Sequence, residues 1–575
     1  MNKPDKKIEL LCPAGSLSKL KASVSGGADA VYLGLGKFNA RQSAGNFDIA
    51  ELEEAVKICK SNDVKIYLTM NTLVKNSELK EFLELIKEAY ERGIDAVIIQ
   101  DASLISVIKK NFPELKIHLS TQTGIMNSSH ANLFSGIDRI NLARELSKKN
   151  IELLRKNFKK ETEMFIHGAL CACISGSCLF SSLLGQRSGN RGRCAQPCRK
   201  LYNDAFLLST KELCLIDKLP EIINFGINSL KIEGRMRNPF YAYTSASVYR
   251  KAIDSFYKGK FQVTFEMRAE LQKAYSREFT EGKYSDKYVF NLKKASGDFE
   301  SKEVSYNPPV KNIKIEKREV NLDPVILKTK NSIKKQLIVR VYNEEDAITA
   351  EKYADIICLD LFHKDFQTIG HRLNKPLYAV TPRIMFDSDL DSMKKKIKEL
   401  SPAGIIAGNL GILGFDLDIP IILDYNCNCF NDLQLNYYQT QKARPIISPE
   451  LSLQELQEFK NKDFIVFVHG KIRLMTLAHE LIENTILDNK GFDFQVKKIF
   501  NGAEIFNGKE LGLFNKLRPI VKAGINQFYI DTESNLAASI EDVLKIYRQI
   551  IDGKTPDASK IQKHYNLGWS KLGVW

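Results

Sequence analysis

The residues with the clearest chemical capacity form a cysteine-rich segment in the first half of the chain. Residues 171–198 read CACISGSCLFSSLLGQRSGNRGRCAQPC, and Cys171, Cys178, Cys194 and Cys198 are separated by six, fifteen and three residues. Four thiolates suit either a tetrahedral zinc ion or a cubane iron–sulfur cluster. Structural zinc usually uses close cysteine pairs, so the gap of six residues favours an iron–sulfur centre.

Basic side chains surround these cysteines. Their positive charge would offset cluster thiolates or hold an anionic substrate. We single out Arg193 as a contact to the cofactor, and Cys173 is a spare candidate for a ligand. The arginines within or next to the segment are Arg187, Arg191, Arg193 and Arg199.

The elements that must position this segment alternate regularly over the first 260 residues. Helical patterns such as 49–62 and 77–93, with apolar residues three or four apart, separate strand-like runs. Eight such units fit a TIM-like (β/α)₈ barrel better than an open sheet. The predicted strands are 8–15, 28–35, 64–71, 95–101, 116–124, 137–145, 163–170 and 228–235.

The second half of the chain repeats the first. Residues 164–178 align with the run beginning at 465, so that His167 falls on His469. On this ungapped alignment Arg473 stands where the first half has Cys171, so the metal site belongs to the first module alone. We therefore expect a duplicated α/β barrel module with a short connector. The expected domains are an iron–sulfur barrel at 1–260, a connector or small subdomain at 261–330, and a degenerate barrel without the cysteine cluster at 331–575.

Residues at the carboxyl ends of barrel strands face the active site. Glu233 with Arg235 and Arg237 forms a carboxylate flanked by guanidinium groups, which could grip a carboxylated or phosphorylated ligand. An internal salt bridge that closes the barrel mouth is the competing interpretation. The residues that this rule selects are Asn71, Asp101, Gln122, Arg144, Glu145, His167, Glu233 and Arg235.

Four residues carry specific expectations. Arg144 and Glu145 are candidates for catalysis or for an internal salt bridge, and only the glutamate recurs in the second half. Arg41, after the second predicted strand, is a candidate anion contact. His167 is a candidate base or substrate contact, but its persistence as His469 also fits a structural role.

The charge composition of the chain indicates what kind of partner it binds. Lys and Arg number 84 against 69 Asp and Glu, and the net charge of +15 favours an anionic partner such as RNA. A solvated lysine-rich surface is the alternative, because no basic block stands out. No apolar run suits a signal peptide or a bilayer span, so we expect a cytoplasmic protein with no membrane partner. Cysteines clustered in a reducing compartment argue against a disulfide framework.

Several sequence blocks in one order resemble the collagenase-like peptidase family. They are residues 13–34, FNAR (38–41), LARELS (142–147), 165–178, GRCAQPCR (192–199) and LKIEGRMRNPFY (230–241). The family was named for a reported collagenase activity. It also includes bacterial proteins for oxygen-independent hydroxylation of a transfer-RNA uridine, of a ribosomal-RNA cytidine and of ubiquinone precursors.

The resemblance implies a 4Fe-4S cluster held by Cys171, Cys178, Cys194 and Cys198. It also implies hydroxylation of a base in tRNA or rRNA, with prephenate, a small carboxylated metabolite, as co-substrate. Some relatives draw a ligand from near the LKIEGR strand, where this chain has Glu233. The choice between Cys198 and Cys173 as fourth ligand therefore stays open.

Two other functions compete with hydroxylation. A collagenase-like peptidase has little support, since HELIE (479–483) lacks the second histidine of HExxH and no GxSxG motif is present. A non-enzymatic RNA-binding or assembly factor fits the charge and the duplication. It does not explain why one module alone keeps a cluster of thiols among arginines.

Overall fold

A computed structural model describes residues 7–556, apart from 276, 287–303, 314, 316–317, 324, 326, 328, 331–333 and 534–537, and beyond that range Tyr565, Gly573 and Val574. The chain forms two compact units. The first comprises Met1–Val74, Glu78–Gly176 and Gly189–Val325, and the second comprises Lys75–Ser77, Ser177–Ser188 and Ile326–Trp575. Of the predicted domains, residues 1–6 and the stretch 287–303 of the connector lie outside the described residues.

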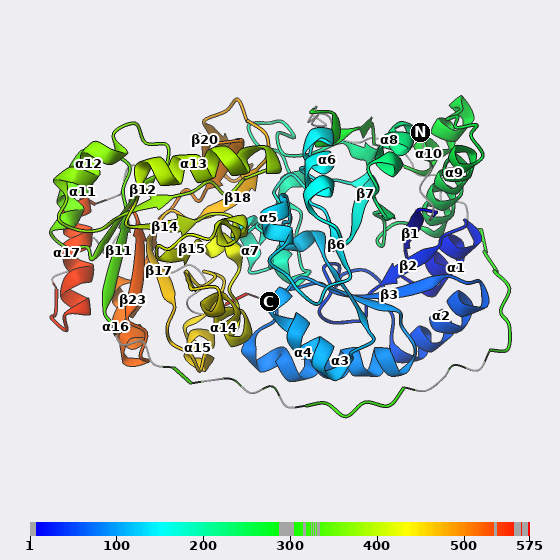
Figure 1. The fold of residues 1–575 in the computed structure, drawn as a ribbon, viewed down its shortest axis with the longest axis horizontal. Helices are drawn as coiled ribbons and strands as arrows, with labels where there is room; N and C mark the ends of the chain where they lie inside the picture. Colours follow the sequence, from blue (N-terminus) through cyan, green and yellow to red (C-terminus); the bar gives the residue numbers. More distant parts are fainter. Residues whose placement is uncertain are drawn as a thin grey trace. The chain divides into compact units, whose positions relative to one another are not determined.

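Parallel strands of the first unit close into a barrel, as predicted (Figure 1). Each strand pairs with its neighbour in parallel, and the last one, β9, closes the barrel by pairing with both β7 and β1. In the described part of the unit the barrel strands are β1 (Glu9–Pro13), β2 (Ala30–Leu33), β3 (Lys65–Met70), β4 (Ala96–Ile99), β5 (Lys116–Leu119), β6 (Arg139–Asn141), β7 (Glu161–Ala169) and β9 (Ser229–Ile232). Each overlaps one of the eight predicted runs.

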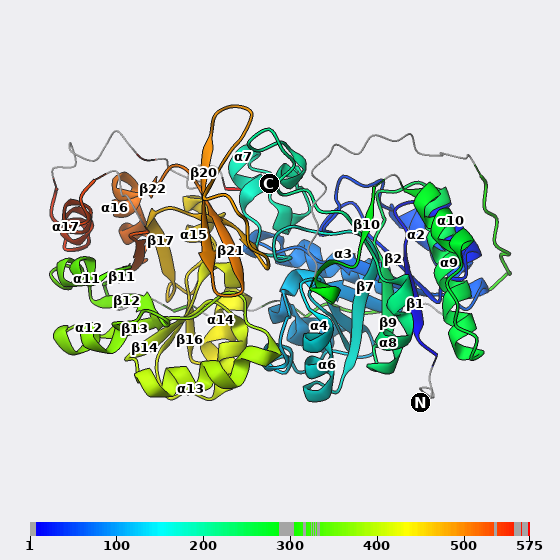
Figure 2. The same ribbon diagram turned by 90° about the horizontal axis from the view of Figure 1, so that it is seen from above.

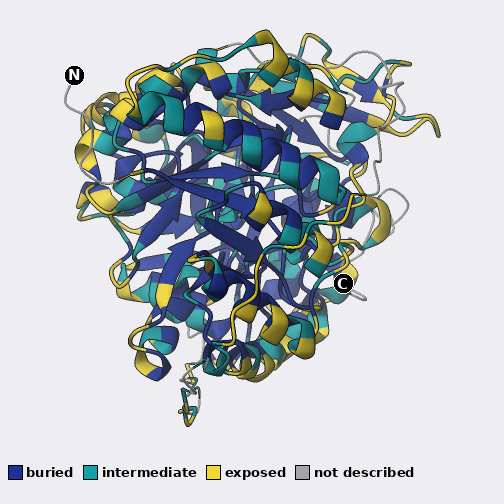
Figure 3. Ribbon diagram, turned by 90° about the vertical axis from the view of Figure 1, so that its right-hand side faces the viewer, coloured by how far each residue is buried: buried dark blue, intermediate teal, exposed yellow. Residues whose placement is uncertain are grey.

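Helices between the strands cover the barrel, and their sequences explain where they begin and what they bury. Asp48 and Glu51 form a capping box at the start of α2, and α3 buries Leu79, Phe82, Leu83 and Ile86 against the sheet. Figure 3 shows the strands buried inside a ring of helices with exposed outer faces. The helices are α1 (Leu17–Ser25), α2 (Ile49–Ser61), α3 (Leu79–Glu91), α4 (Ile105–Asn111), α5 (Ser128–Ala131), α6 (Lys148–Asn157), α8 (Leu219–Asn224) and α9 (Pro239–Tyr257).

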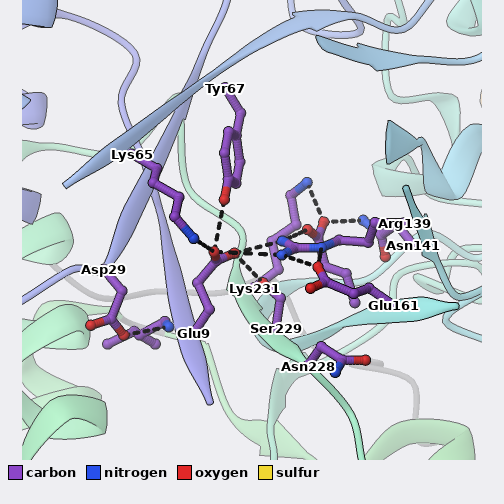
Figure 4. Close-up of polar contacts among 12 residues, drawn as sticks. Glu9, Asp29, Lys65, Tyr67, Arg139, Asn141, Glu161, Asn228, Ser229 and Lys231 are labelled. Atoms are coloured by element: carbon purple, nitrogen blue, oxygen red, sulfur yellow. Dashed lines mark hydrogen bonds and ion pairs between the residues drawn. The ribbon is translucent and has the colours of Figure 1, made fainter. Parts of the chain in front are cut away.

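Charged side chains fill the amino-terminal end of the barrel interior (Figure 4). Arg139 donates to Glu9 at 2.5 Å and to Glu163 at 3.4 Å, and Lys231 donates to Glu163 at 2.8 Å. Tyr67 donates to Glu9 at 2.7 Å. Burial alone would raise the pKa of Glu9, but the charge and hydrogen bonds of Arg139 lower it to about 2. These ions are therefore paired rather than neutralised.

Two short strands extend the sheet of the first unit beyond the barrel, one between β7 and β9 and the other after α9. β8 (Glu212–Cys214) pairs antiparallel with β7, and β10 (Phe279–Thr280) pairs with β8. The predicted connector begins with a helix, α10 (Phe265–Ala274). No helix among the described residues is long and apolar enough to cross a membrane.

The second unit repeats the strand order of the first. β17 and β11 both pair with β23 in parallel, and a single bridge from Ile446 to Ile465 joins the β16 end to β17. The duplication is thus visible as a second, less completely closed sheet. Its parallel strands in the described residues are β11 (Gln336–Arg340), β12 (Ile356–Asp360), β13 (Leu377–Val380), β14 (Gly404–Ala407), β15 (Ile421–Leu423), β16 (Ala443–Pro445), β17 (Ile465–Gly470) and β23 (Gln527–Asp531).

Helices also cover the second sheet. In the described residues they are α11 (Glu344–Glu351), α12 (Phe366–Arg372), α13 (Leu390–Leu400), α14 (Asp432–Thr440), α15 (Leu453–Glu458), α16 (Phe514–Lys522) and α17 (Ile540–Ile551). The last of these, α17, matches α9 of the first unit. Tyr547 on α17 donates to the carbonyl of Val468, as Tyr249 on α9 donates to that of Ile166.

An antiparallel sheet is inserted after β17, where the first unit has its cysteines (Figure 2). It consists of β18 (Arg473–Leu477), β19 (Thr485–Leu487), β20 (Asp493–Ile499) and β21 (Gly502–Phe506), and the chain then returns as β22 (Leu511–Gly512). The segment 177–188, which contains α7 (Phe180–Gly185), packs on this sheet within the second unit: the Phe180 and Phe494 rings lie 4.9 Å apart.

The ionic network is the main internal difference between the two barrels. In the second, Arg444 takes the place of Arg139 and donates to two neutral side chains, Gln336 at 3.0 Å and Gln527 at 2.6 Å. We expect Arg139→Met to destabilise the first unit by about 3–5 kcal/mol, because it removes the main ionic partner of the buried Glu9 and leaves Glu163 with Lys231 alone.

The matched substitution Arg444→Met should cost only about 1–2 kcal/mol, since it leaves neutral amides. Urea unfolding followed by tryptic cleavage of each unit measures both values. Equal losses in the two variants would contradict the role assigned to the buried charges.

Candidate functional site

Arg235, just beyond β9, is a buried cation at the carboxyl end of the first barrel. Its side chain is 3% exposed and donates to Thr69 Oγ1 and to Asn39 Oδ1, each at 3.0 Å. Both partners are neutral. Burial is the main reason that the pKa of Arg235 falls to about 10. A desolvated guanidinium held by neutral groups is well suited to bind an anion.

Glu233 pairs with a different arginine. Its Oε1 lies 3.6 Å from Arg41 Nη2. Burial opposes the charge of Arg41, but Glu233, Cys194 and Cys171 together raise its pKa. The structure thus brings Arg41 close both to Glu233 and to two of the predicted metal ligands. The competing interpretation of Glu233 was an ion pair at the barrel mouth. Glu233 does form such a pair, but with Arg41, whereas Arg235 donates to Thr69 and Asn39.

A second group of arginines surrounds Glu212 on β8. This carboxylate is 1% exposed, and it accepts hydrogen bonds from Arg277 at 3.1 Å and from Tyr275 at 3.2 Å. Arg237 lies 3.8 Å away and stacks 3.9 Å from the Tyr275 ring centre. Arg199, the neighbour of Cys198, lies 4.0 Å away. Burial raises the pKa of Glu212 against the opposing charges of these arginines.

Arg144 and Glu145 support the start of the cysteine segment. Arg144 donates to the Ala169 carbonyl at 3.1 Å and to Ser175 Oγ at 2.7 Å. Glu145 is fully buried, and burial raises its pKa although Arg144 and backbone amides, that of Ser175 included, lower it. The pair therefore contacts the loop that carries Cys171.

His167 lies among aromatic rings. A bulge in the β7–β9 pairing separates it from Phe165, and Tyr249 Oη lies 3.4 Å from its Nδ1. Its ring packs 5.9 Å from Tyr241 and 5.4 Å from Phe279. Burial, and then Arg237, lower its pKa to about 3. The second unit repeats this environment, where His469 lies 3.4 Å from Tyr547 Oη and also has a pKa of about 3.

The predicted metal ligands are chemically suited to an iron–sulfur centre. Cys171, Cys194 and Cys198 belong to the first unit and Cys178 to the second; all four are of intermediate exposure and outside any disulfide, whereas Cys173 is fully buried. Arg41 supplies positive charge beside two of them. Within the described residues, no group of three or more His, Cys, Asp or Glu side chains is positioned to hold a metal ion. The ligand set therefore stays a prediction.

Two arginines of the cysteine segment, Arg191 and Arg193, have different contacts. Arg193 donates to Gln42 at 2.9 Å on the surface. Arg191 forms a bidentate pair with Glu78, with distances of 2.9 Å and 2.6 Å. Arg191 therefore anchors the segment to the barrel, and the role of Arg193 as a cofactor contact stays a prediction.

Sequence comparison places this architecture among known proteins. The model of peptidase family U32 matches residues 15–294 and 364–569. The chain belongs to peptidase family U32. The two matched stretches correspond largely to the two units, so the family's sequence pattern extends over the duplicated barrel.

Curated U32 relatives match about half of this chain. An uncharacterized protease of Methanocaldococcus jannaschii is 40% identical over 299 residues, 48% of this chain and 73% of that protein. The tRNA hydroxylation protein P1 of Bacillus subtilis is 35% identical over 341 residues, 54% of this chain and 81% of that protein. The 23S rRNA 5-hydroxycytidine synthase of Escherichia coli is 32% identical over 332 residues, 55% of this chain and 50% of that protein.

Several residues of the mouth were not among the predicted site residues. Asn39 and Thr69 hold Arg235. Asn39 lies in the FNAR block, which was noted only as part of the family resemblance, and nothing in the sequence distinguishes Thr69 from other polar strand residues. Glu212 had a usable signal, because the tripeptide KEL at 211–213 recurs at 509–511. Arg277 and Tyr275 reach Glu212 from the connector, which sequence reasoning treated as a separate element.

The buried histidine predicts a pH effect. His167 has a pKa of about 3 in the folded protein against 6.5 unfolded, so its contribution to stability is complete above pH 6.5 and is lost as pH falls towards 3. His167→Asn should flatten the loss of unfolding free energy between pH 6 and 4 by up to about 1.4 kcal/mol per pH unit. Thermal unfolding in a pH series measures this. The exposed His371→Asn is the control, and equal slopes in all three proteins would refute the prediction.

Proposed function

We propose that this chain is an RNA-modifying enzyme that hydroxylates a base in tRNA or rRNA without oxygen, using an iron–sulfur cluster and prephenate as hydroxyl donor. The names of the U32 relatives from Bacillus subtilis and Escherichia coli support RNA base hydroxylation. The structural observation that carries the proposal is the buried Arg235 with neutral partners at the barrel mouth.

The mouth of the first barrel suits a carboxylated donor. Prephenate carries two carboxylates, and carboxylates bind guanidinium groups through charge-assisted hydrogen bonds. Arg235 offers a desolvated cation, and Arg41 lies near enough to influence its pKa. We propose that Arg235 and Arg41 hold one carboxylate of the donor, and that Glu233 orients Arg41 through their ion pair.

We assign the cluster, of the 4Fe-4S type, to Cys171, Cys178, Cys194 and Cys198. When bound, such a cluster supplies redox-active or Lewis-acidic iron. The role of this chain's residues is to hold and neutralise it. Arg144 fixes the loop between Cys171 and Ser177 through Ser175, while Arg41 offsets thiolate charge.

Peptidase activity has less support, despite the family name and the relative named as a protease. His479 and Glu480 of the HELIE sequence lie outside any helix, whereas HExxH zinc sites need both histidines on one helical face. A purely RNA-binding role leaves the cationic mouth of the first barrel without a ligand. Hydroxylation uses both the mouth and the thiols.

Metal content tests the ligand set. Anaerobically purified protein should contain about four irons and four sulfides per chain. A variant with Cys171, Cys178, Cys194 and Cys198 all changed to Ala should lose both. Cys173→Ala is the matched control and should keep them. If Cys173→Ala loses iron and the single variant Cys198→Ala keeps it, the fourth ligand is Cys173 and not Cys198. Zinc in place of iron would overturn the proposal.

Nucleoside analysis tests the reaction. Deleting the gene should remove one hydroxylated nucleoside from bulk tRNA or rRNA, and the wild-type gene should restore it. Arg235→Gln should restore it at least about tenfold less well, because a charge-assisted contact to the donor is lost. Arg268→Gln, which breaks an exposed pair with Asp217, should complement fully. An unchanged nucleoside mass spectrum after deletion would refute hydroxylation.

A further inference from the structure

We infer that the second unit carries a docking surface for single-stranded segments of the RNA substrate, built from a stacked phenylalanine pair and lysines. The docking surface consists of Phe362, Phe500, Lys364, Lys471 and Lys498. This inference rests on the proposed function, which makes RNA the partner. The docking surface is a binding site in addition to the barrel mouth, where the proposed hydroxylation takes place.

The aromatic pair is exposed where phenylalanine is normally buried. Phe362 follows β12, and Phe500 lies in the turn between β20 and β21. Their ring centres are 5.0 Å apart with planes 14° from parallel. The two residues are 44% and 38% exposed. Exposed, stacked rings offer the π surface on which unpaired bases stack.

Lysines flank this pair along the chain. Lys364 comes two residues after Phe362, and Lys498 comes two residues before Phe500. An open concavity of about 570 Å³ continues along the inserted sheet, and three of its lining residues are lysines. The lining residues are Lys471, Asn484, Thr485, Asp493, Gln495, Val496, Lys497 and Lys498.

Two of these three lysines can exchange their present partners for phosphate. Lys471 donates to the neutral amide of Gln495 at 3.3 Å. Lys498 pairs with Glu480 at 2.8 Å, but both side chains are largely exposed, at 73% and 61%, and such pairs contribute little. Lys497 is different, because it neutralises the buried Glu533.

The scaffold under the docking surface is ordered by its own contacts. Phe494 and Val496 of β20 are buried, and Asn501 donates to Asp389 at 2.9 Å, which ties the turn beside Phe500 to the barrel. The inserted sheet begins directly after β17, as the cysteine segment begins directly after β7. One insertion point of the duplicated barrel thus carries thiols in one copy and a basic aromatic surface in the other.

Binding of the whole chain to RNA tests the inference without any hydroxyl donor. We would measure fluorescence anisotropy with labelled oligoadenylate and with bulk tRNA. The variants are Phe362→Ala with Phe500→Ala, and Lys364→Gln with Lys471→Gln and Lys498→Gln; Lys497 is kept because its loss would strand Glu533. Matched controls are Phe265→Ala, 80% exposed on α10, and Lys80→Gln with Lys395→Gln, whose side chains are 88% and 79% exposed.

We expect the aromatic variant to bind oligoadenylate at least about tenfold more weakly. The lysine variant should reduce the slope of log affinity against log salt by about 0.7 per lost phosphate contact, or about 2 in all. Both controls should bind as the wild type does. Wild-type affinity in both variants, or equal losses in the controls, would overturn the inference.

Other arms separate the possible explanations. If inorganic phosphate at millimolar concentration displaces RNA and the lysine variant loses only phosphate binding, the concavity is a small-anion site and the inference fails. If the variants bind RNA weakly but deletion of the gene changes no nucleoside, the docking surface stands and the proposed hydroxylation fails. If hydroxylation is confirmed and the variants bind normally, only the docking surface fails.

Discussion

Closure of the first barrel depends on ions paired inside it. Arg139 on β6 bonds to Glu9 on β1 and to Glu163 on β7, and Lys231 on β9 bonds to Glu163. These strands meet where the barrel closes. A shift of one residue in any of them would turn a buried charge away from its partner, at a cost that a marginally stable fold cannot absorb. The network therefore fixes the register that brings the carboxyl ends of β7 and β9 together.

The two barrels differ in the partners of their buried arginines. The second barrel uses neutral glutamines around Arg444, and its closing seam is reduced to a single bridge. At its carboxyl end, Arg473, aligned with Cys171, donates to Asp531 at 2.7 Å and to Glu504 at 2.9 Å. Asp531 stands where the first barrel has Glu233. The second mouth thus pairs Arg473 with carboxylates, whereas in the first Arg235 donates to the neutral side chains of Thr69 and Asn39.

Sequence patterns could predict the strands because barrel strands are apolar runs of regular spacing. The repeat could also be predicted from the sequence, since the runs that contain His167 and His469 align with each other. The ionic network was not predictable, because Glu9 and Arg139 begin their strands and resemble ordinary polar flanks. The structure was also needed to separate Arg235, with its neutral partners, from Glu233, which pairs with Arg41. Their closeness in sequence had suggested a single cluster.

The segment 177–188 has a consequence for how the two halves can be divided. It lies within the first barrel's portion of the chain, yet Ser182 donates to Glu450 and Leu179 donates to the Leu474 carbonyl, both in the second unit. A chain cut between the repeats would leave α7 without its packing partners and would remove the hydrogen bond from Ser182 to Glu450. The duplicated modules are therefore interdependent in folding, and recombination could not exchange one of them as an intact cassette.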